Sequence, residues 1–252
     1  MTPPETMAPR RTALITGSGR NIGRAVALAL AADGLNIVVN GLNQRVPCEE
    51  TAEAARAHGG EAIVAMGDVG TSEGCDKVAG TGISRFGAID VLVHNAAIRP
   101  ASPFLEMDEA EWRRVLEVNL MGAFWLARLC LPGMVEAGWG RIVTFAGMNA
   151  IQGYVGRAHV SASKHAGWGL TKALAKEFGP KGITVNCISP GPIRTGHDDP
   201  AMTAHIKGQV SRIPTGRLGE PDEVAAAVSL LASEKGAFIN GQLIQVNGGA
   251  QT

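Results

Sequence analysis

Short apolar segments alternate with helical patterns along almost the whole of this 252-residue chain. The apolar segments, such as residues 13–16 and 36–40, lack the polar alternation of a strand that faces water on one side. Strands of this kind need cover on both faces, and the intervening helices can supply it. The sequence therefore predicts an α/β protein with a doubly wound parallel sheet of about seven strands and helices on both faces.

The same pattern divides the chain into a short leader and one folded domain. Residues 1–10 contain three prolines and predict a flexible leader, whereas residues 11–252 predict a single domain without a linker or repeat. Residues 191–214 form the one long irregular stretch, and we expect them to act as a substrate lid. The expected strands are 13–16, 36–40, 62–66, 91–93, 141–145, 184–188 and 243–246. The expected helices are 22–33, 49–58, 75–86, 109–136 with an interruption near Pro132, 160–178 and 222–232.

A glycine-rich turn, Thr16 to Gly23, joins the first strand to the first helix. Spaced glycines let a backbone approach a pyrophosphate, and a helix amino terminus offers free N–H groups and a positive dipole end. Because the turn follows a strand and opens a helix, it predicts dinucleotide binding on a Rossmann-type fold. Asn21 stands where glycine is commoner, and asparagine tolerates left-handed backbone well. The predicted binding residues are Gly17, Ser18, Gly19, Arg20, Asn21, Ile22 and Gly23.

The end of the second strand bears on the choice of dinucleotide. The segment 38–41 includes Asn40 but no carboxylate that could hold a ribose 2′-hydroxyl. Arg20, in the turn, offers a guanidinium to a 2′-phosphate, although it could equally be a solvated loop charge. We therefore expect NADP(H) to be favoured over NAD(H), with Asn40 among the cofactor-binding residues.

Charge and cysteine content restrict the partners. The 23 basic and 23 acidic side chains cancel, which favours neither nucleic acid nor an anionic membrane. The four cysteines are scattered without metal-ligand spacing, so we expect buried thiols and no metal site. Residues 1–11 lack the apolar core of a signal peptide, and no run approaches the roughly 18 apolar residues of a membrane helix. We expect a cytoplasmic protein that acts on a small molecule.

Several further motifs resemble those of the short-chain dehydrogenase/reductase family over nearly the whole chain. Residues 16–23 are similar to the family's TGxxxGxG. Residues 94–97, His-Asn-Ala-Ala, resemble its NNAG, with changes at the first and last positions. Residues 190–195 are similar to its PGxxxT, and residues 216–224 and 247–249 to its C-terminal signatures.

The resemblance implies roles for particular residues. Asp68 and Val69 would meet the adenine ring, Asn119 would distort its helix and hold a water, and Lys164 would bind the nicotinamide ribose. The family also implies a homo-oligomer, a tetramer or dimer, with the helices of Asn119 and Lys164 at the main interface. The further residues implied at the cofactor are Asn95, Ala96, Ala97, Pro190, Gly191, Ile193 and Thr195.

The reaction chemistry of the family does not carry over intact. Family members use a serine after the fifth strand and a Tyr-x-x-x-Lys helix, in which the tyrosine is the general acid or base. This chain keeps Lys164, but Val160 stands at the tyrosine position and Gly147 at the serine position. Neither can donate a proton, and loss of a positioned acid typically costs about 10²–10⁴ in rate. The standard reduction through serine and tyrosine is therefore excluded.

Three other side chains are candidates for the missing groups. Tyr154, the only tyrosine, precedes the helix of Lys164 and could lean into the pocket, or line its wall or an interface. His159 precedes Val160 and has a suitable pKa for proton transfer, or it caps or packs the helix. Asn149 is a weaker candidate for holding a substrate oxygen.

Three functions remain open from the sequence. We favour an NAD(P)-dependent oxidoreductase for a small carbonyl or alcohol, in which Lys164 and Asn119 hold the cofactor and a water and Tyr154 or His159 moves the proton. The second is a lyase or hydratase that uses Lys164 and His159 as acid and base. The third is a catalytically silent cofactor-binding subunit or sensor.

Overall fold

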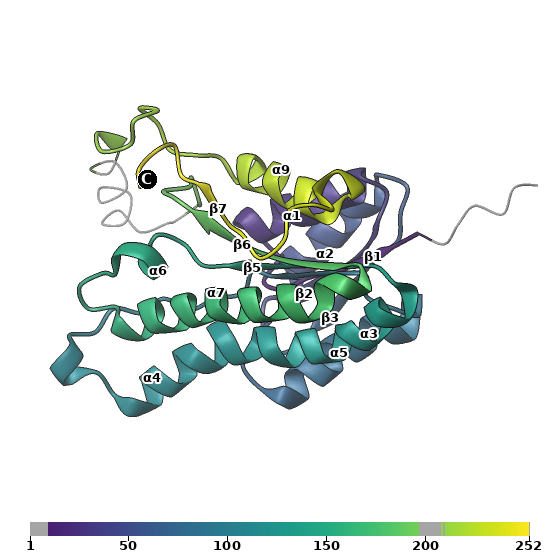
Figure 1. Ribbon diagram of the computed structural model, residues 1–252, viewed down its shortest axis with the longest axis horizontal. Helices are drawn as coiled ribbons and strands as arrows, with labels where there is room; N and C mark the ends of the chain where they lie inside the picture. Colours follow the sequence, from purple (N-terminus) through teal and green to yellow (C-terminus); the bar gives the residue numbers. More distant parts are fainter. Residues whose placement is uncertain (1–9, 197–207, 209, 252) are drawn as a thin grey trace, which may run out of the picture.

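The computed structural model describes residues 10–196, 208 and 210–251. Seven parallel strands form one sheet in the order β3-β2-β1-β4-β5-β6-β7 (Figure 1). The order reverses between β1 and β4, so that crossovers leave in opposite directions from this point. The predicted single-domain, doubly wound fold is therefore confirmed. The strands are β1 (Thr12–Ile15), β2 (Asn36–Gly41), β3 (Ala62–Met66), β4 (Val91–His94), β5 (Gly140–Phe145), β6 (Ile183–Pro190) and β7 (Leu243–Val246).

Helices cover both faces of this sheet (Figure 1). One face carries α1 (Asn21–Ala32), α2 (Arg45–Arg56) and α9 (Pro221–Ala232). The other carries α3 (Ser72–Phe86), α5 (Gly122–Ala137) and α7 (Ala158–Phe178). Two apolar cores result because side chains alternate along each strand: Ala13 and Ile15 enter the first core and Leu14 enters the second. The four cysteines are buried, as expected.

The long helical pattern after residue 109 corrects one prediction. The helix was expected to break near Pro132, but α5 runs through this residue. The irregular part lies earlier, where the π-helical segment η2 (Glu117–Met121) joins α4 (Glu109–Leu116) to α5. A proline removes one backbone donor, and burial of Leu131 and Met134 holds the helix around it.

Residues Glu109–Ala137 also correct the expectation about membrane-length segments. Together they form a helix long and apolar enough to cross a membrane, with a mean hydropathy of 1.4 in its most apolar window. Half of that window is buried within the fold. The core helix of a globular domain meets the same criterion, and α5 packs in the second core beside α3.

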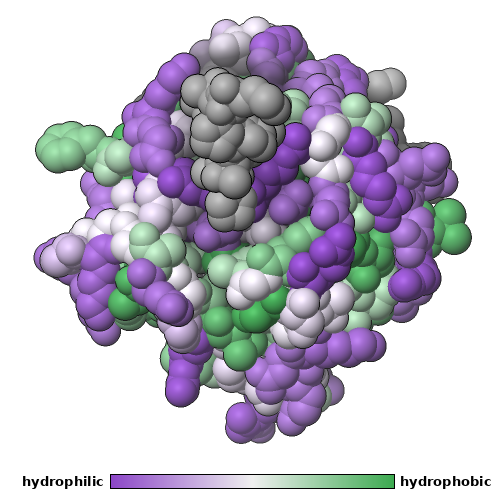
Figure 2. All heavy atoms as spheres, turned by 90° about the vertical axis from the view of Figure 1, so that its right-hand side faces the viewer, coloured by the Kyte–Doolittle hydropathy of each residue, from purple (hydrophilic) through white to green (hydrophobic). Residues whose placement is uncertain are grey.

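The loops at the carboxyl ends of the strands lie at the left of Figure 1. They include the short helix α6 (Asn149–Gln152) and the 3₁₀ turn η1 (Phe104–Glu106), neither of which the sequence predicted. Figure 2 shows the opposite face, at the amino ends, where hydrophilic side chains surround a smaller apolar band. Ligands of doubly wound sheets bind at the carboxyl edge, which is therefore the expected place of the functional site. Two further 3₁₀ turns are η3 (Gly179–Lys181) and η4 (Glu234–Gly236).

Half of the expected substrate lid, residues 191–214, lies outside the described residues. Its first part leaves β6 and forms a bridge between Ile193 and Gly219. This bridge ties the start of the segment to the chain just before α9.

Candidate functional site

The glycine-rich turn has the geometry of a phosphate-binding loop. Gly17 and Asn21 have positive φ angles of 61° and 50°, and Asn21 is the only non-glycine residue in the described chain with this conformation. A Cβ at Gly23 would lie 2.3 Å from the Gly17 carbonyl oxygen, so only glycine allows this close crossing. Arg20 caps α1 with extended backbone and no side-chain hydrogen bond. The N–H groups in the first turn of α1 therefore receive no hydrogen bond from the side chain of Arg20 and can bind an anion.

Asn40 anchors this turn to the sheet. Its Oδ1 accepts a hydrogen bond from the Gly17 N–H at 3.2 Å. Its Nδ2 donates to the carbonyls of Ala65 at 3.0 Å and Gly67 at 3.2 Å. The Asn40 N–H donates to Ser18 Oγ at 3.1 Å, and that hydroxyl donates to the Ile15 carbonyl. Asn40 therefore positions the turn, and its side chain is occupied within the protein.

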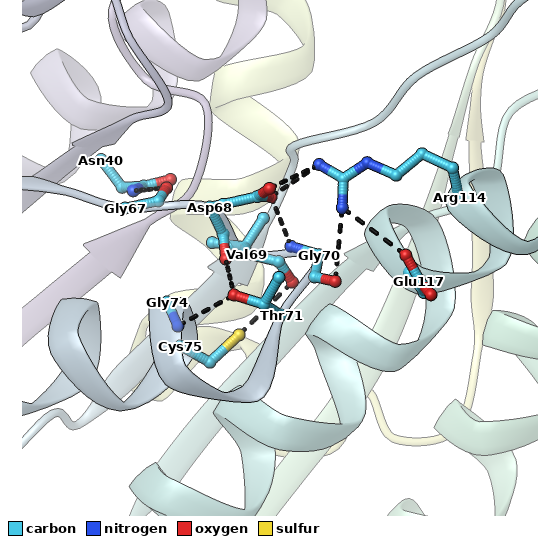
Figure 3. A network of polar contacts seen from close by, with 10 residues as sticks. All are labelled: Asn40, Gly67, Asp68, Val69, Gly70, Thr71, Gly74, Cys75, Arg114 and Glu117. Carbon is cyan, nitrogen blue, oxygen red and sulfur yellow. Dashed lines mark hydrogen bonds and ion pairs between the residues drawn. The ribbon is translucent and has the colours of Figure 1, made fainter.

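Asp68, predicted at the adenine, is held by an arginine that the sequence analysis did not single out (Figure 3). Arg114 of α4 donates from Nη2 to both carboxylate oxygens of Asp68, at 2.8 and 2.7 Å. Its Nη1 reaches the Gly70 carbonyl at 3.3 Å. Partial burial raises the pKa of Asp68, but the hydrogen bonds from Arg114 and the Gly70 N–H outweigh it and leave the pKa below its ordinary value. The loop from Asp68 to Thr71 is thus locked to α4 by an ionised carboxylate.

The segment after β4 closes over the turn. Asn95 Nδ2 donates to the carbonyls of Thr16 at 3.0 Å and Gly17 at 3.1 Å. The Ala96 N–H donates to Thr16 Oγ1 at 2.9 Å. The structure therefore brings Asn95 and Ala96 together with the predicted phosphate loop, and Ala97 lies exposed beside them.

His94, which replaces the first asparagine of the family motif, is fully enclosed. Its Nε2 lies 3.1 Å from the Val118 carbonyl oxygen and its Nδ1 lies 3.4 Å from Thr16 Oγ1. Burial and, to a smaller extent, the charge of Lys164 lower the pKa of His94 to about 3, although the hydrogen bond with the Val118 carbonyl opposes this shift. The ring is therefore neutral, and Nε2–H donates to the Val118 carbonyl.

Asn119 joins three parts of the site. It is buried in η2, where its Oδ1 accepts from the Ile98 N–H at 2.9 Å and its Nδ2 donates to the Ile98 carbonyl at 3.0 Å. The same Nδ2 donates to Ser163 Oγ at 3.1 Å. The asparagine thus fixes the chain after β4 against α7, one residue before Lys164.

Lys164 is buried on α7 with its ammonium group pointing to β5. Its Nζ donates to the Phe145 carbonyl at 2.7 Å. Burial lowers the pKa of Lys164 to about 8; Cys187 raises it and the charge of Arg99 lowers it. Val160, one helical turn earlier, is completely buried, and Gly147 follows β5 with a φ of 87°.

The structure does not bring His159 to Lys164. His159 is completely buried, and its Nε2 lies 3.2 Å from Glu111 Oε1 on α4. Its Nδ1 accepts from the Val160 N–H at 3.0 Å, and its ring stacks on Trp112. Both ring nitrogens are occupied, which matches the packing alternative and weighs against proton transfer to a substrate.

Tyr154 lies at the surface between α6 and α7. Its side chain is 41% exposed, and its hydroxyl accepts a hydrogen bond from Gln152 Nε2 at 3.2 Å. Within the described chain, no hydrogen bond joins it to Lys164. Asn149 begins α6, and its side chain lies outside the described part of the structure.

The segment after β6 completes the carboxyl edge. The Gly191 N–H donates to the Val246 carbonyl of β7 at 2.9 Å. The Ile193–Gly219 bridge follows, and Pro190, Gly191, Ile193 and Thr195 therefore lie along one strand end and its continuation. Thr195 also takes part in an interaction with the rest of the protein.

Comparisons with known proteins agree with this architecture. A family model described as enoyl-(acyl carrier protein) reductase matches residues 17–251. Nodulation protein G of Azospirillum brasilense is 37% identical over 245 residues, which are 95% of this chain and 98% of that protein. The 3-oxoacyl-[acyl-carrier-protein] reductase of Synechocystis sp. is 36% identical over 242 residues, 95% of this chain and 96% of that protein.

Solved structures extend the likeness to three dimensions. A candidate NAD(P)-dependent gluconate 5-dehydrogenase from Beutenbergia cavernae, with NADP bound at low occupancy, superimposes with a TM-score of 0.86. It is 37% identical and covers 95% of this chain and 96% of its own. The chain therefore belongs to the short-chain dehydrogenase/reductase family.

The buried neutral ring of His94 predicts an acid-sensitive fold. Its folded pKa lies below that of the unfolded chain, so the unfolded chain binds the extra proton and stability falls as the pH drops below about 6.5, towards 3. In a fully buried case this costs roughly 1.4 kcal/mol for each pH unit. The free energy of unfolding of wild type and of His94→Asn can be measured with denaturant at several pH values between 4 and 7. When plotted against pH, it should change less steeply for His94→Asn than for wild type.

His58→Asn is the matched control, because His58 lies exposed at the end of α2. Its free energy of unfolding should change with pH as steeply as that of wild type. If the free energy of unfolding of His94→Asn also changed as steeply as that of wild type, this result would contradict a neutral buried histidine.

Proposed function

We propose that this protein is an NAD(P)-dependent oxidoreductase that interconverts a small carbonyl compound and the corresponding alcohol. The observation that carries the proposal is the placement of Lys164, whose buried Nζ lies 2.7 Å from the Phe145 carbonyl oxygen. The Asn119 clamp holds the neighbouring Ser163, and both residues lie at the edge that also carries the phosphate turn. The named activities of the Synechocystis reductase and the Beutenbergia candidate dehydrogenase support the same reaction class.

The residues present fit a dinucleotide. The turn offers the N–H groups of the first turn of α1 and the close backbone approach at Gly23. Residues 17–23 would hold the pyrophosphate, Asp68, Val69, Asn95, Ala96 and Ala97 would line the adenosine half, and Asn40 would support them from below. Pro190, Gly191, Ile193, Thr195 and Lys164 would lie at the nicotinamide half. A bound nicotinamide supplies the hydride for reduction.

Lys164 is the side chain best suited to supply the proton. A pKa of about 8 places it close to neutral pH, where proton transfer by a side chain is most efficient. His159 is enclosed by α4, and Tyr154 is directed to the surface. In reduction the Lys164 ammonium would release its proton towards the carbonyl oxygen of the substrate, directly or through a water held near Asn119.

Arg20 supports a preference for NADP(H). Its side chain is exposed at the start of α1 and forms no ion pair with a described residue. Asn40 Oδ1 and Nδ2 are used inside the protein, so no side chain of β2 is left to select a ribose 2′-hydroxyl. A guanidinium is the group that best pairs with a 2′-phosphate.

A fluorescence titration with NADPH and NADH tests the cofactor assignment. Wild type should bind NADPH more tightly, and Arg20→Ala should weaken NADPH binding about tenfold, or about 1.4 kcal/mol, while NADH binding changes less than twofold. Arg128→Ala is the control, because Arg128 is exposed on α5 and stacks on Phe124. Equal losses for both nucleotides would exclude a 2′-phosphate contact, and no binding of either would exclude the redox function.

The pH dependence of reduction tests the role of Lys164. Because the ammonium form donates, kcat/KM for reduction should fall as the pH rises through about 8. Lys164→Arg keeps the positive charge but cannot release a proton, so it should lower kcat/KM by about 10²–10⁴ and remove this inflection. NADPH binding by Lys164→Arg should stay close to wild type.

Tyr154→Phe is the companion variant and should retain activity within twofold. A loss in Tyr154→Phe that matches the loss expected of Lys164→Arg would assign the proton to Tyr154 and leave the oxidoreductase function intact. His159 is already engaged in stacking and hydrogen bonding. Its replacement should therefore lower the stability of the protein and leave the pH dependence of kcat/KM unchanged.

A catalytically silent cofactor-binding subunit is the second candidate. Val160 and Gly147 favour it, because neither position carries a proton donor. This function predicts nucleotide binding with no turnover of any carbonyl compound. Lys164→Arg, Tyr154→Phe and the His159 variant should then all be as inactive as wild type. A lyase or hydratase, by contrast, would turn over its substrate without consuming nucleotide.

We also propose a homo-oligomer, as the family suggests. The outer side of the long helix forms a hollow of about 430 Å³ lined by Glu109, Trp112, Arg113, Leu116, Glu117 and Met121. Apolar and charged groups meet there on a helix whose apolar window is only half buried. Such a mixed helical face suits packing against a second copy.

A further inference from the structure

Two arginines near the amino-terminal half of α7, Arg99 and Arg157, have no acidic partner among the described residues. Arg99 follows β4 and is exposed, and Arg157 caps the amino terminus of α7 without a side-chain capping bond. Neither guanidinium forms an ion pair or hydrogen bond with another residue of the described chain, whereas Arg113 and Arg114 on α4 both pair with carboxylates. The first turn of α7 also contains no acidic residue.

The backbone holds the two arginines in place from both sides. Asn119 binds the N–H and the carbonyl of Ile98, the residue before Arg99. Three residues after Arg99, the Ser102 N–H donates to the Gly156 carbonyl at 2.8 Å, directly before Arg157. The loop that carries Arg99 is therefore fastened to the start of α7 and to the Asn119–Ser163 contact.

Like charges are concentrated at this point. Partial desolvation of the otherwise exposed Arg99 lowers its pKa and the charge of Arg157 lowers it further, while Arg99 in turn lowers the pKa of Lys164. The amino terminus of α7 adds the positive end of its dipole. The nearby carboxylate of Glu111 is bound to His159. Three cations that have no counter-ion among the described residues repel one another, and an anion bound among them would relieve this repulsion.

We propose that Arg99 and Arg157 bind the carboxylate of the substrate, so that this enzyme acts on small oxo acids and hydroxy acids. The inference rests on the proposed oxidoreductase function and narrows its substrate class. Arginine suits the task because its planar fork pairs with both oxygens of a carboxylate. Bound in this way, the acid would present its oxo group to Lys164, which the same loop and helix hold.

The reaction leaves the carboxylate unchanged. In reduction, a hydride from the dinucleotide forms the new C–H bond at the oxo carbon as the C=O π bond breaks. The electron pair of that bond passes to oxygen, which takes a proton from Lys164 and becomes the hydroxyl. The dinucleotide is oxidised by two electrons and the oxo acid is reduced by two.

Matched acids and esters test the proposal. The probes are pyruvate, acetoacetate and 4-oxopentanoate, which place the carboxylate at three distances from the ketone, each with its neutral methyl ester. Binding to the protein with NADPH is followed by thermal stabilisation, and reduction by loss of NADPH absorbance. At least one acid should bind and react at least tenfold better than its ester.

Arg99→Gln and Arg157→Gln should each reduce this preference at least tenfold, and Arg99→Lys should retain part of it. Without substrate, both glutamine variants should unfold at a temperature equal to or above that of wild type, because repulsion is removed. Arg128→Gln, on the exposed side of α5, should change neither quantity. A lower unfolding temperature for both glutamine variants would make the arginines structural and overturn the proposal.

The two levels of proposal fail in different ways. If NADPH binds and ketones are reduced but no acid is preferred to its ester, the anion site is wrong and the oxidoreductase function stands. If acids stabilise the protein through Arg99 and Arg157 but NADPH neither binds nor is consumed, the anion site stands and the redox function is wrong.

Discussion

The seven strands of this protein are covered by helices on both faces, and their side chains are committed to two apolar cores. Polar chemistry is therefore displaced to the strand ends, where the chain leaves the sheet. The phosphate turn after β1, the segment after β4 and the residues around Gly147 after β5 meet at one edge for this reason. Lys164 reaches that edge from α7, because its helix crosses back over the end of β5.

Polar residues at this edge form hydrogen bonds with the loops of the protein itself, and these bonds fix the loops in place. Asn40 fixes the turn, Asn119 fixes the loop after β4, and Arg114 fixes the loop of Asp68. Each makes two or more hydrogen bonds to backbone or carboxylate groups, so the loops have little freedom to rearrange. A site assembled in this way is organised in advance, which lowers the conformational cost of binding a dinucleotide.

The sequence predicted those features that follow from a repeating hydrophobic pattern or from a motif with fixed residue spacing. Unbroken apolar runs predicted the strands within a few residues, and the spaced glycines predicted the tight turn between β1 and α1. The sequence did not predict contacts between segments that are distant along the chain. The pairing of Arg114 with Asp68 and the enclosure of His159 by α4 depend on how helices pack, and no local pattern contains that information. The continuity of α5 through Pro132 has the same origin, because burial outweighed a local helix-breaking signal.

The backbone at Gly147 restricts which side chains this position accepts. Its φ of 87° belongs to a region that residues with a side chain rarely adopt, and a Cβ there would find open space, with the Pro190 carbonyl oxygen at 4.0 Å. Room for a serine is therefore present, but its backbone would be strained in this conformation. The backbone conformation after β5 and the residue at position 147 therefore depend on each other. A serine introduced at this position would be accommodated without strain only if the course of the chain after β5 changed with it.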